Sequence, residues 1–413
     1  MKSGILTIGT EILFGQIVNS NAAFLSKSLN DVGVDVLYHY TVGDNPKRME
    51  DALRLLLEDC DLVITTGGLG PTQDDITAEI VAKVAGEKIV LDEEIFENIK
   101  KMFQSTGRKM TENNKRQACV PEHCRILPND TGLAPGFVCE FDGKAVMCLP
   151  GPPWEMEGMF ENYGLKYIKE KSDANIEYKF VKTVGIGESA LETALMDLID
   201  EQKDPTIATY CNEGEAYLRI ASKRDTKEEA DQAIEEVLEE VKNRIGKNIY
   251  SYEKESLTQV IGKIVKERGL TISSAESCTG GLFADSHIQN PGSSDYFKMG
   301  LVTYTEEAKM KILGVKKETL EKYTAVSRET AIEMVEGLEK VSGSDICVSV
   351  TGLCGPGVGS IDKPVGLVYT AIRYNGETYC LENNFRNSGR NSIRKRSVMT
   401  MNSMIFDALG GLK

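Results

Sequence analysis

The sequence lacks cysteine pairs, long apolar runs and all but a few histidines, and each absence excludes a class of protein. Its ten cysteines are scattered singly, so neither a cysteine-paired zinc site nor a disulfide framework is expected, and reduced thiols in a cytoplasm are the simplest interpretation. Three histidines leave little scope for catalysis or metal binding by imidazole. No stretch approaches the roughly 18 apolar residues of a membrane span, and Met1–Gly9 has no signal-peptide pattern. We expect a cytoplasmic protein without a membrane partner.

Negative charge is in excess and unevenly spread. The net charge of −15 divides into −9 for residues 1–170, −7 for residues 171–254 and +1 for residues 255–413. An acidic chain repels the phosphate backbone of nucleic acid, so we expect no nucleic-acid partner. At 413 residues the chain exceeds one ordinary core, and two or three domains are expected.

The first segment alternates strand and helix patterns. Strands are expected at Ile5–Ile8, Asp35–Val42 and Leu62–Thr66, with helices near residues 22–32 and 47–58. A further helix is expected between Leu91 and Phe103. Such alternation predicts a parallel, doubly wound sheet whose ligands bind at the carboxyl ends of the strands.

Polar loops follow these strands. The glycines of Gly67–Gly70 can offer backbone N–H groups to a phosphate, and Thr72 can add a hydroxyl. Asp44, Asp74 and Asp75 are hard oxygen ligands of the kind that Mg²⁺ or Mn²⁺ prefers. Alternatively, the last two aspartates are an N-terminal helix pair favoured by the helix dipole.

Three motifs in this segment resemble the N-terminal domain of the competence/damage-inducible protein A (CinA) family. They are residues 9–22, Thr66–Asp75 and Leu149–Met156. That domain is similar to the molybdopterin-binding fold, and family members are associated with metal-dependent hydrolysis of ADP-ribose. The resemblance implies a divalent metal (Mg, Mn or Co) at Asp44, Asp74 and Asp75, with phosphate cradled by Gly67, Gly68, Gly70 and Thr72. Weaker candidates are Glu11, Asn19 and Glu155, each of which could instead hold its own loop.

The middle segment predicts a small α+β module. Residues 178–184 and 216–222 read as two strands, and helices are expected after Gly185 and over residues 225–245. Gly185-Ile-Gly-Glu188 is similar to the glycine loop of a KH domain. Because the segment is acidic, we expect the KH shape without RNA binding, and a spacer or dimer-forming role.

The third segment is organised around Leu270–Gly281, a strand that runs into a tight turn and a helix at residues 282–289. Ser277, Cys278 and Thr279 sit where the strand ends, and two glycines let the backbone bend. Helix N–H groups pointing toward such a hydroxyl or thiol suit a nucleophile beside an oxyanion site. A Ser/Thr helix N-cap is the alternative.

A base for Ser277 must be something other than histidine, because His287 lies inside the following helix and the other two belong to another domain. Lys309 is the candidate, with Tyr304 to orient it or relay a proton. Burial or neighbouring positive charge would have to lower the pKa of Lys309. Alternatively, Lys309 is an ordinary surface lysine.

Four motifs in this segment resemble the C-terminal domain of the CinA family, which is similar to nicotinamide-mononucleotide (NMN) amidohydrolases. They are Ala275–Gly281, Val302–Tyr304 with Ala308-Lys309, Val350–Gly357 and Lys363–Gly366. The resemblance implies hydrolysis of NMN to nicotinate mononucleotide and ammonia without a cofactor. It makes Ser277 the nucleophile, Lys309 the base and Tyr304 its partner. The substrate-binding residues it implies are Thr279, Gly280, Thr351, Gly352, Arg390 and Arg394.

Some details stay open. Thr305–Glu307 and Leu353-Cys354 depart from the family's more usual residues, which could alter pocket shape and rate. The basic run from Arg386 to Arg396 is either a phosphate clamp or a salt-bridged helix face. Sequence physics does not exclude Cys278 as the nucleophile in place of Ser277.

The sequence as a whole predicts a three-part α/β protein. The parts are residues 1–170, a metal-dependent ADP-ribose pyrophosphatase; 171–254, a linker or dimerisation module; and 255–413, an NMN deamidase. The expected partners are these nucleotides and a second copy of the chain. Alternatives are a molybdopterin-binding or molybdenum-cofactor module and a DNA-competence accessory protein.

Overall fold

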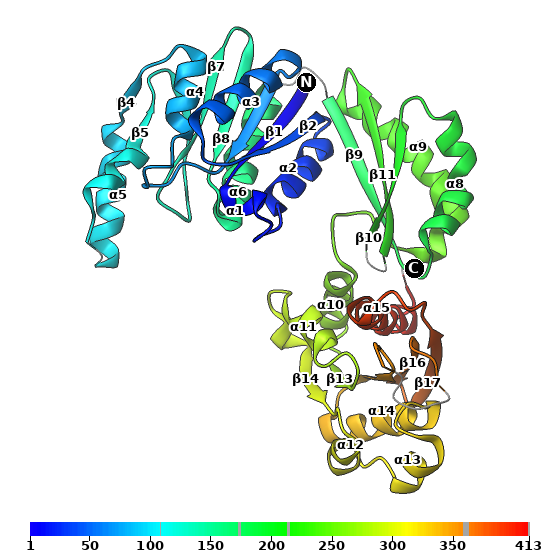
Figure 1. Cartoon of the computed structure of the whole chain (residues 1–413). Coiled ribbons are helices and arrows are strands. Elements are labelled where there is room, and N and C mark those ends of the chain that lie inside the picture. Colours follow the sequence, from blue (N-terminus) through cyan, green and yellow to red (C-terminus); the bar gives the residue numbers. More distant parts are fainter. Residues whose placement is uncertain (108, 172–174, 213–214, 358–362, 412–413) are drawn as a thin grey trace. The chain divides into compact units, whose positions relative to one another are not determined.

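The computed structural model describes residues 1–107, 109–171, 175–212, 215–357 and 363–411 (Figure 1). The chain divides into two compact units, Met1–Ile176 and Glu177–Lys413. The first contains one large sheet, and the second contains two sheets, each with its own helices. The expected three-part α/β architecture is therefore confirmed.

The first unit is built on a six-stranded sheet in the order β2-β1-β3-β8-β7-β6. Its strands are β1 (Lys2–Ile8), β2 (Asp35–Val42), β3 (Leu62–Thr66), β6 (Cys124–Leu127), β7 (Gly136–Phe141) and β8 (Lys144–Leu149). A separate antiparallel ribbon pairs β4 (Ile89–Leu91) with β5 (Cys119–Pro121). The helices are α1 (Thr10–Leu13), α2 (Ser20–Asp31), α3 (Pro46–Asp59), α4 (Thr77–Ala85), α5 (Glu93–Thr106), α6 (Pro153–Met159) and α7 (Leu165–Lys171), with the short η1 (Glu112–Ala118) and η2 (Phe160–Gly164).

Helices cover both faces of this sheet because its central strands are apolar on both sides. α3 and α4 pack on the face that carries Leu6 and Val63. α2 and α6 pack on the opposite face, which carries Ile5 and Ile64. The doubly wound arrangement is thus confirmed, and it leaves the carboxyl ends of β1, β2 and β3 free for polar loops.

The strands from which a parallel sheet was expected, β1, β2 and β3, do run parallel, and β8 joins them. The sheet as a whole is mixed, because β7 pairs antiparallel with both β8 and β6. The change of direction is made by a tight turn at Asp142-Gly143, where both residues have positive φ. The helix expected from Leu91 begins at Glu93, because Leu91 belongs to β4 and Asp92 caps the helix by accepting from the N–H of Ile95.

The middle sheet has four strands rather than the two expected, in the order β10-β11-β9-β12. They are β9 (Asn175–Thr183), β10 (Thr206–Asn212), β11 (Glu215–Arg224) and β12 (Ile249–Ser251). The helices α8 (Glu188–Glu201) and α9 (Lys227–Ile245) pack together with the sheet around one apolar core, and η3 (Gly246–Asn248) follows them.

The C-terminal sheet has the order β14-β13-β15-β16-β17. Its strands are β13 (Ile272–Glu276), β14 (Phe297–Val302), β15 (Ile346–Gly352), β16 (Leu367–Tyr374) and β17 (Glu377–Asn384). One face packs on α10 (Leu257–Glu267), α11 (Leu282–Ile288) and α15 (Arg390–Ala408). The other packs on α12 (Glu306–Leu313), α13 (Lys317–Tyr323) and α14 (Arg328–Ser342), and η4 (Ser293–Asp295) precedes β14. β14, β13 and β15 run parallel, which brings their carboxyl ends to one edge.

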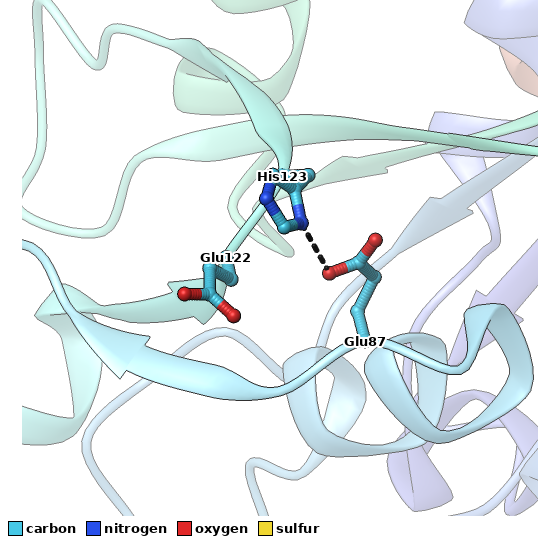
Figure 2. A group of neighbouring side chains, drawn as sticks. All are labelled: Glu87, Glu122 and His123. Atoms are coloured by element: carbon cyan, nitrogen blue, oxygen red, sulfur yellow. Dashed lines mark hydrogen bonds and ion pairs between the residues drawn. The ribbon is translucent and has the colours of Figure 1, made fainter.

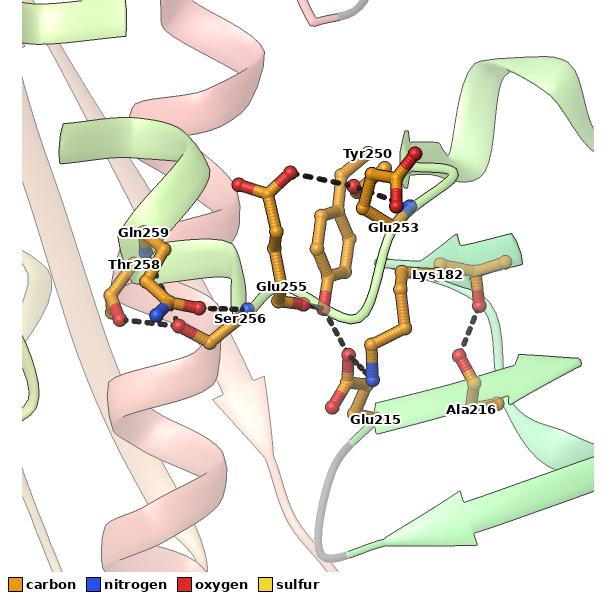
Figure 3. A network of polar contacts seen from close by, with 11 residues as sticks. Lys182, Glu215, Ala216, Tyr250, Glu253, Glu255, Ser256, Thr258 and Gln259 are labelled. Carbon is orange, nitrogen blue, oxygen red and sulfur yellow. Dashed lines mark hydrogen bonds and ion pairs between the residues drawn. The ribbon is translucent and has the colours of Figure 1, made fainter. Parts of the chain in front are cut away.

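The two sheets of the second unit share a polar and aromatic junction (Figure 3). Tyr250 of β12 packs edge-on against Phe406 of α15, with ring centroids 6.3 Å apart. Its hydroxyl donates to the carboxylate of Glu215, which also pairs with Lys182 at 3.0 Å. Burial raises the pKa of Tyr250, so the phenol stays a neutral donor. Within the described residues, no helix is both long and apolar enough to cross a membrane.

Candidate active sites

The turn after β13 presents Ser277 at the edge where the parallel strands end. The N–H of Ser277 donates to the carbonyl of Val350 at 3.1 Å, which ties the turn to the neighbouring strand β15. Gly280 and Gly281 follow with φ of +63° and +96°, so the chain can reverse before α11 begins. Ser277 therefore lies between a strand and a helix, as predicted.

A buried carboxylate, Glu276, organises this turn. It accepts hydrogen bonds from the hydroxyl of Thr279 at 2.7 Å and from the N–H groups of Gly281, Phe283 and Ala284 at 3.0–3.1 Å. The first N–H groups of α11 therefore bind Glu276 and do not point at a substrate. The expectation that they form the oxyanion site is wrong, because a carboxylate already satisfies them.

Lys309 is buried beside Ser277 and is no surface lysine. Its Nζ lies 3.0 Å from Ser277 Oγ and donates to the carbonyls of Thr303 at 2.9 Å and Tyr304 at 3.2 Å. Only 1% of the residue is exposed. Burial lowers the pKa of Lys309, the shift that a lysine base requires. Tyr304 meets Lys309 through its backbone carbonyl, while its side chain is 61% exposed.

Cys278 is buried in the apolar core of this domain. Its thiol hydrogen-bonds with Cys354, and this contact and burial raise its pKa. A raised pKa makes the reactive thiolate scarce at neutral pH. The structure thus brings Ser277, and not Cys278, into hydrogen-bonding contact with the lysine.

The remaining amidase candidates build the loops around Ser277. Thr279 binds Glu276, and Thr351 donates to the carbonyl of Ala325 at 2.7 Å, so both hydroxyls have structural partners. A Cβ on Gly352 would lie 2.6 Å from Val368 Cγ2, so this position has no room for a side chain.

Two arginines of α15 hold the loops together. Arg390 Nη1 donates to the carbonyl of Gly355, and Arg394 Nη2 donates to that of Thr279, both at 2.6 Å. Neither forms an ion pair with a carboxylate of the described residues, so they supply positive charge beside the turn that carries Ser277. Nearby, Arg396 stacks its guanidinium over Phe385 at 4.9 Å.

The first unit has its own cavity, of about 630 Å³, at the carboxyl ends of β1, β2 and β3. Most of the residues predicted for the N-terminal site line it. They are Glu11, Asp44, Gly67, Gly68, Gly70, Thr72, Asp74, Asp75 and Glu155. Asn19 does not line it: its side chain donates to Thr7 and caps α2 by accepting from the N–H of Ala22.

Protein donors fix the carboxylates of this cavity. The N–H and hydroxyl of Thr72 donate to Asp75 at 2.8 and 2.6 Å, and the same hydroxyl contacts Asp74. That contact lowers the pKa of Asp74, which stays ionised. Thr10 donates to Asp44 through its N–H at 3.1 Å and its hydroxyl at 2.7 Å. Thr72 therefore positions Asp74 and Asp75, and Thr10 positions Asp44.

The glycines pack tightly against the surrounding backbone. A Cβ on Gly67 would lie 2.2 Å from the carbonyl oxygen of Ile8, and one on Gly68 would lie 2.2 Å from Thr77 Oγ1. The N–H of Gly67 donates to the carbonyl of Leu149. Contrary to the expectation, this N–H group is therefore not available to a phosphate. The sequence is glycine-rich here because strands and loop approach closely.

The cavity's charge suits a divalent cation. Five carboxylates line it, and no lysine, arginine or histidine is among its described lining residues. Ionised carboxylates at one cavity are oxygen donors of the type that Mg²⁺ and Mn²⁺ prefer. The donor set therefore fits a metal. The three predicted aspartates are nevertheless less closely grouped than Glu87, Glu122 and His123 elsewhere in this unit.

The tightest group of potential metal ligands among the described residues lies elsewhere and was missed by sequence reasoning (Figure 2). Glu87, Glu122 and His123 have ligand atoms within 4.8 Å of one another. His123 Nδ1 pairs with Glu87 at 2.9 Å, and this carboxylate raises the pKa of the imidazole. The ion pair accounts for the arrangement at this exposed surface without a metal.

Family comparisons cover nearly the whole chain. Three family models match in succession: "Probable molybdopterin binding domain" over residues 4–170, "Damage-inducible protein CinA KH domain" over residues 178–251 and "CinA C-terminal domain" over residues 254–409. The predicted likeness of the middle segment to a KH domain is thereby confirmed.

Whole-length relatives carry the same family name. A competence-damage inducible protein of Clostridium botulinum (strain Okra / Type B1) is 47% identical over 398 residues, which cover 96% of this chain and 97% of the relative. One of Acetivibrio thermocellus is 48% identical over 406 residues, 98% of each chain. A crystal structure of the competence/damage inducible protein CihA from Agrobacterium tumefaciens is 43% identical, covering 37% of this chain and 93% of that chain with a TM-score of 0.36.

Proposed function

The chain belongs to the CinA family of competence- and damage-inducible proteins, and from this premise we propose that it is a bifunctional hydrolase of pyridine nucleotides. Its C-terminal domain hydrolyses the carboxamide of NMN to nicotinate mononucleotide and ammonia. Its N-terminal domain hydrolyses ADP-ribose to AMP and ribose 5-phosphate with the help of a divalent metal.

The observation that carries the amidase proposal is the buried contact of 3.0 Å between Lys309 Nζ and Ser277 Oγ. A serine hydroxyl is a weak nucleophile unless a neighbouring base removes its proton. Lys309 is that base, because burial lowers its pKa and two backbone carbonyls fix its amine. Ser277 and Lys309 are thus already in contact before a substrate binds.

The reaction then proceeds in two halves. Lys309 takes the hydroxyl proton as Ser277 Oγ attacks the carboxamide carbon, and the tetrahedral adduct collapses with breakage of the C–N bond. Lys309 returns the proton to the departing nitrogen, so ammonia leaves and an ester to Ser277 remains. Lys309 then takes a proton from water as the water attacks this ester. The bond from the acyl carbon to Ser277 Oγ breaks, Lys309 returns the proton to Oγ, and nicotinate mononucleotide is released.

The charges around Ser277 suit a nucleotide that ends in a phosphate. Arg390 donates to the carbonyl of Gly355, and Arg394 donates to that of Thr279 and, at 3.4 Å, to Asn391 Oδ1, whereas a guanidinium has five N–H donors. Enough N–H donors remain on each side chain to bind a phosphate, with which arginine forms paired hydrogen bonds. The two arginines therefore both shape the loops and clamp the substrate.

Ammonia release from NMN tests the amidase, with Ser277→Ala and Cys278→Ala as paired variants. We expect Ser277→Ala to lower kcat by at least about 10³-fold and Cys278→Ala to stay within about tenfold of the parent, because only Ser277 contacts the base. EDTA should leave the rate unchanged. If only Cys278→Ala lost activity, the Cys278 thiol and not Ser277 would be the nucleophile.

The N-terminal proposal is supported by the acidic cavity of the first unit. A cation held by Asp44, Asp74 and Asp75 would supply the positive charge that a pyrophosphate needs, which the described lining residues lack. Thr72 fixes two of the aspartates, and Thr10 fixes the third. Release of AMP from ADP-ribose, with Mg²⁺ or Mn²⁺ present or removed, tests this activity.

A second candidate for the same cavity is binding of molybdopterin. The name of the family model that matches residues 4–170 favours it. Tight binding of a pterin, with no release of AMP from ADP-ribose in any divalent metal, would replace the hydrolase proposal by this one.

A further inference from the structure

Two thiols meet beside the proposed nucleophile of the C-terminal domain. Cys278 directly follows Ser277, and Cys354 lies in the loop that follows β15. Both belong to one apolar cluster, where they are 6% and 3% exposed, and their thiols are hydrogen-bonded to each other. Neither thiol takes part in the mechanism proposed for Ser277 and Lys309.

Helix α15 fixes the backbone around both thiols. β13 and β15 are neighbouring parallel strands, so the turn with Cys278 and the loop with Cys354 start at the same edge of the sheet. Arg394 donates at 2.6 Å to the carbonyl of the residue after Cys278. Arg390 donates at 2.6 Å to the carbonyl of the residue after Cys354. Because the two arginines lie about one helical turn apart, a single helix holds both thiols in place.

The two sulfurs differ in their tendency to ionise. The hydrogen bond with Cys278 and the positive charges of Arg390 and Arg394 lower the pKa of Cys354. The same hydrogen bond and burial raise the pKa of Cys278, which keeps its proton. A thiolate, and not a thiol, attacks an oxidant. A cysteine of lowered pKa next to a second thiol is the arrangement typical of redox-sensitive pairs.

We propose that Cys278 and Cys354 are an oxidative modification site, at which a small hydroperoxide joins the two thiols in a disulfide. The Cys354 thiolate attacks one peroxide oxygen, the O–O bond breaks, and hydroxide leaves and takes a proton from solvent. The sulfur of Cys278 then attacks the sulfenic acid on Cys354. Its proton goes to the departing hydroxyl, which leaves as water, so the two electrons lost by the sulfurs reduce the peroxide.

The burial of Cys354 selects the class of oxidant. With 3% of the residue exposed, its sulfur is within reach of a molecule about the size of hydrogen peroxide. Glutathione disulfide, a pair of tripeptides, is too large to approach it. The site is therefore expected to respond to a hydroperoxide and not to the thiol–disulfide balance of its surroundings.

The disulfide would displace Ser277, an effect on activity that rests on the proposed amidase function. An S–S bond is about 2.05 Å long, shorter than any contact between unbonded sulfurs, so the turn and the loop must move together. Ser277 precedes Cys278 directly and depends on a contact of 3.0 Å with Lys309. A shift of about 1 Å at a reacting group can cost about 10²-fold in rate. Oxidation should therefore turn the amidase off, and reduction should restore it.

Mass mapping of peptides from the full chain, treated with hydrogen peroxide, tests the modification directly. We expect a Cys278–Cys354 bridge that dithiothreitol removes and that glutathione disulfide does not form. Cys354→Ala and Cys278→Ala should each be free of it. Cys380→Ala is the matched control, because this thiol of β17 is also buried, at 4% exposed, and should leave the bridge intact.

Ammonia release from NMN, measured on the same samples, tests the effect on activity. We expect peroxide to lower the rate of the parent and of Cys380→Ala at least about tenfold, with full recovery in dithiothreitol. Cys354→Ala should keep its own rate within about twofold under the same treatment. An equal loss in Cys354→Ala, or a loss that dithiothreitol does not reverse, would overturn the proposed effect.

The two readouts separate this inference from the function on which its effect rests. A parent that hydrolyses NMN but forms no bridge in peroxide, or forms one only with glutathione disulfide, would refute the modification site and leave the amidase standing. A bridge in a parent that does not hydrolyse NMN would support the modification site and refute the amidase.

Discussion

At the scale of single residues, the behaviour of Lys309 should be visible in the pH dependence of the amidase. The amine acts as a base only when neutral, and burial lowers its pKa from the ordinary value of 10.5. We therefore expect kcat/KM for NMN to rise with pH through an apparent pKa below 10.5 and then to level off. Ammonia release measured from pH 6 to pH 10 checks this.

Lys309→Arg should remove the rising limb, because a guanidinium stays protonated throughout this range. We expect a loss of at least about 10²-fold at every pH. Lys311→Arg, an exposed position of the same helix, should keep the parent's profile. A flat profile in the parent, or an active Lys309→Arg, would assign the base to another group.

The proposed nucleophile and base could be predicted from motifs, whereas their environment could not. Ser277 and Lys309 are 32 residues apart, and only the parallel pairing of β13 with β14 brings them together. The role of Glu276 was not predicted, because this carboxylate ends β13 and reaches the N–H groups of Gly281, Phe283 and Ala284 only across the intervening turn. For Tyr304, the sequence suggested a side-chain role, but the backbone carbonyl makes the contact.

At the scale of elements, Glu276 ties the end of β13 to the start of α11. Glu276→Gln puts an amide where the carboxylate accepts from three N–H groups and two hydroxyls, so it leaves donors unsatisfied. We expect the free energy of unfolding to fall by about 1–3 kcal/mol. Urea denaturation measures it, with Glu377→Gln on the exposed part of β17 as the control. Equal midpoints for the two variants would contradict this role.

Helix α12, which carries Lys309, is held in place by its close approach to α14. A Cβ on Gly337 of α14 would lie 1.8 Å from the carbonyl oxygen of Leu313, the last residue of α12. Gly337→Ala must therefore displace α12. We expect lower stability, by about 1–3 kcal/mol, together with a loss of NMN hydrolysis as Lys309 moves.

Thermal unfolding and ammonia release, measured on the same preparation, check this prediction. Lys340→Ala, an exposed position of α14, should change neither quantity. An active, fully stable Gly337→Ala would show that the two helices separate without cost.

Strand positions were predictable where the local pattern is strong, whereas the antiparallel hairpins of the two larger sheets were not predicted. β2 and β3 have the predicted bounds, because Val, Tyr and Thr are frequent in β2 and Val, Ile and Thr in β3. β10 was missed because this edge strand lacks a clear alternation of buried and exposed residues. The turns at Asp142-Gly143 and Asn375-Gly376 have positive φ at both residues and were usable signals for the antiparallel hairpins.

At the scale of the whole molecule, the two proposed activities reside in separate cores. The apolar clusters around the acidic cavity contain only residues of the first unit. Those around Ser277 contain only residues of the second. A substitution confined to one unit should therefore leave the activity of the other unit unchanged.

This separation predicts reciprocal effects in one full-length protein. Asp44→Asn keeps the shape of the side chain and one acceptor for Thr10 but removes a negative charge from the acidic cavity. We expect it to lower ADP-ribose hydrolysis at least tenfold and to leave ammonia release from NMN unchanged, whereas Ser277→Ala should do the opposite. EDTA should reproduce the Asp44→Asn pattern in the parent, and added Mg²⁺ or Mn²⁺ should reverse it. Loss of both activities in either variant, or loss of ammonia release with EDTA, would mean that the two sites depend on each other or share a metal.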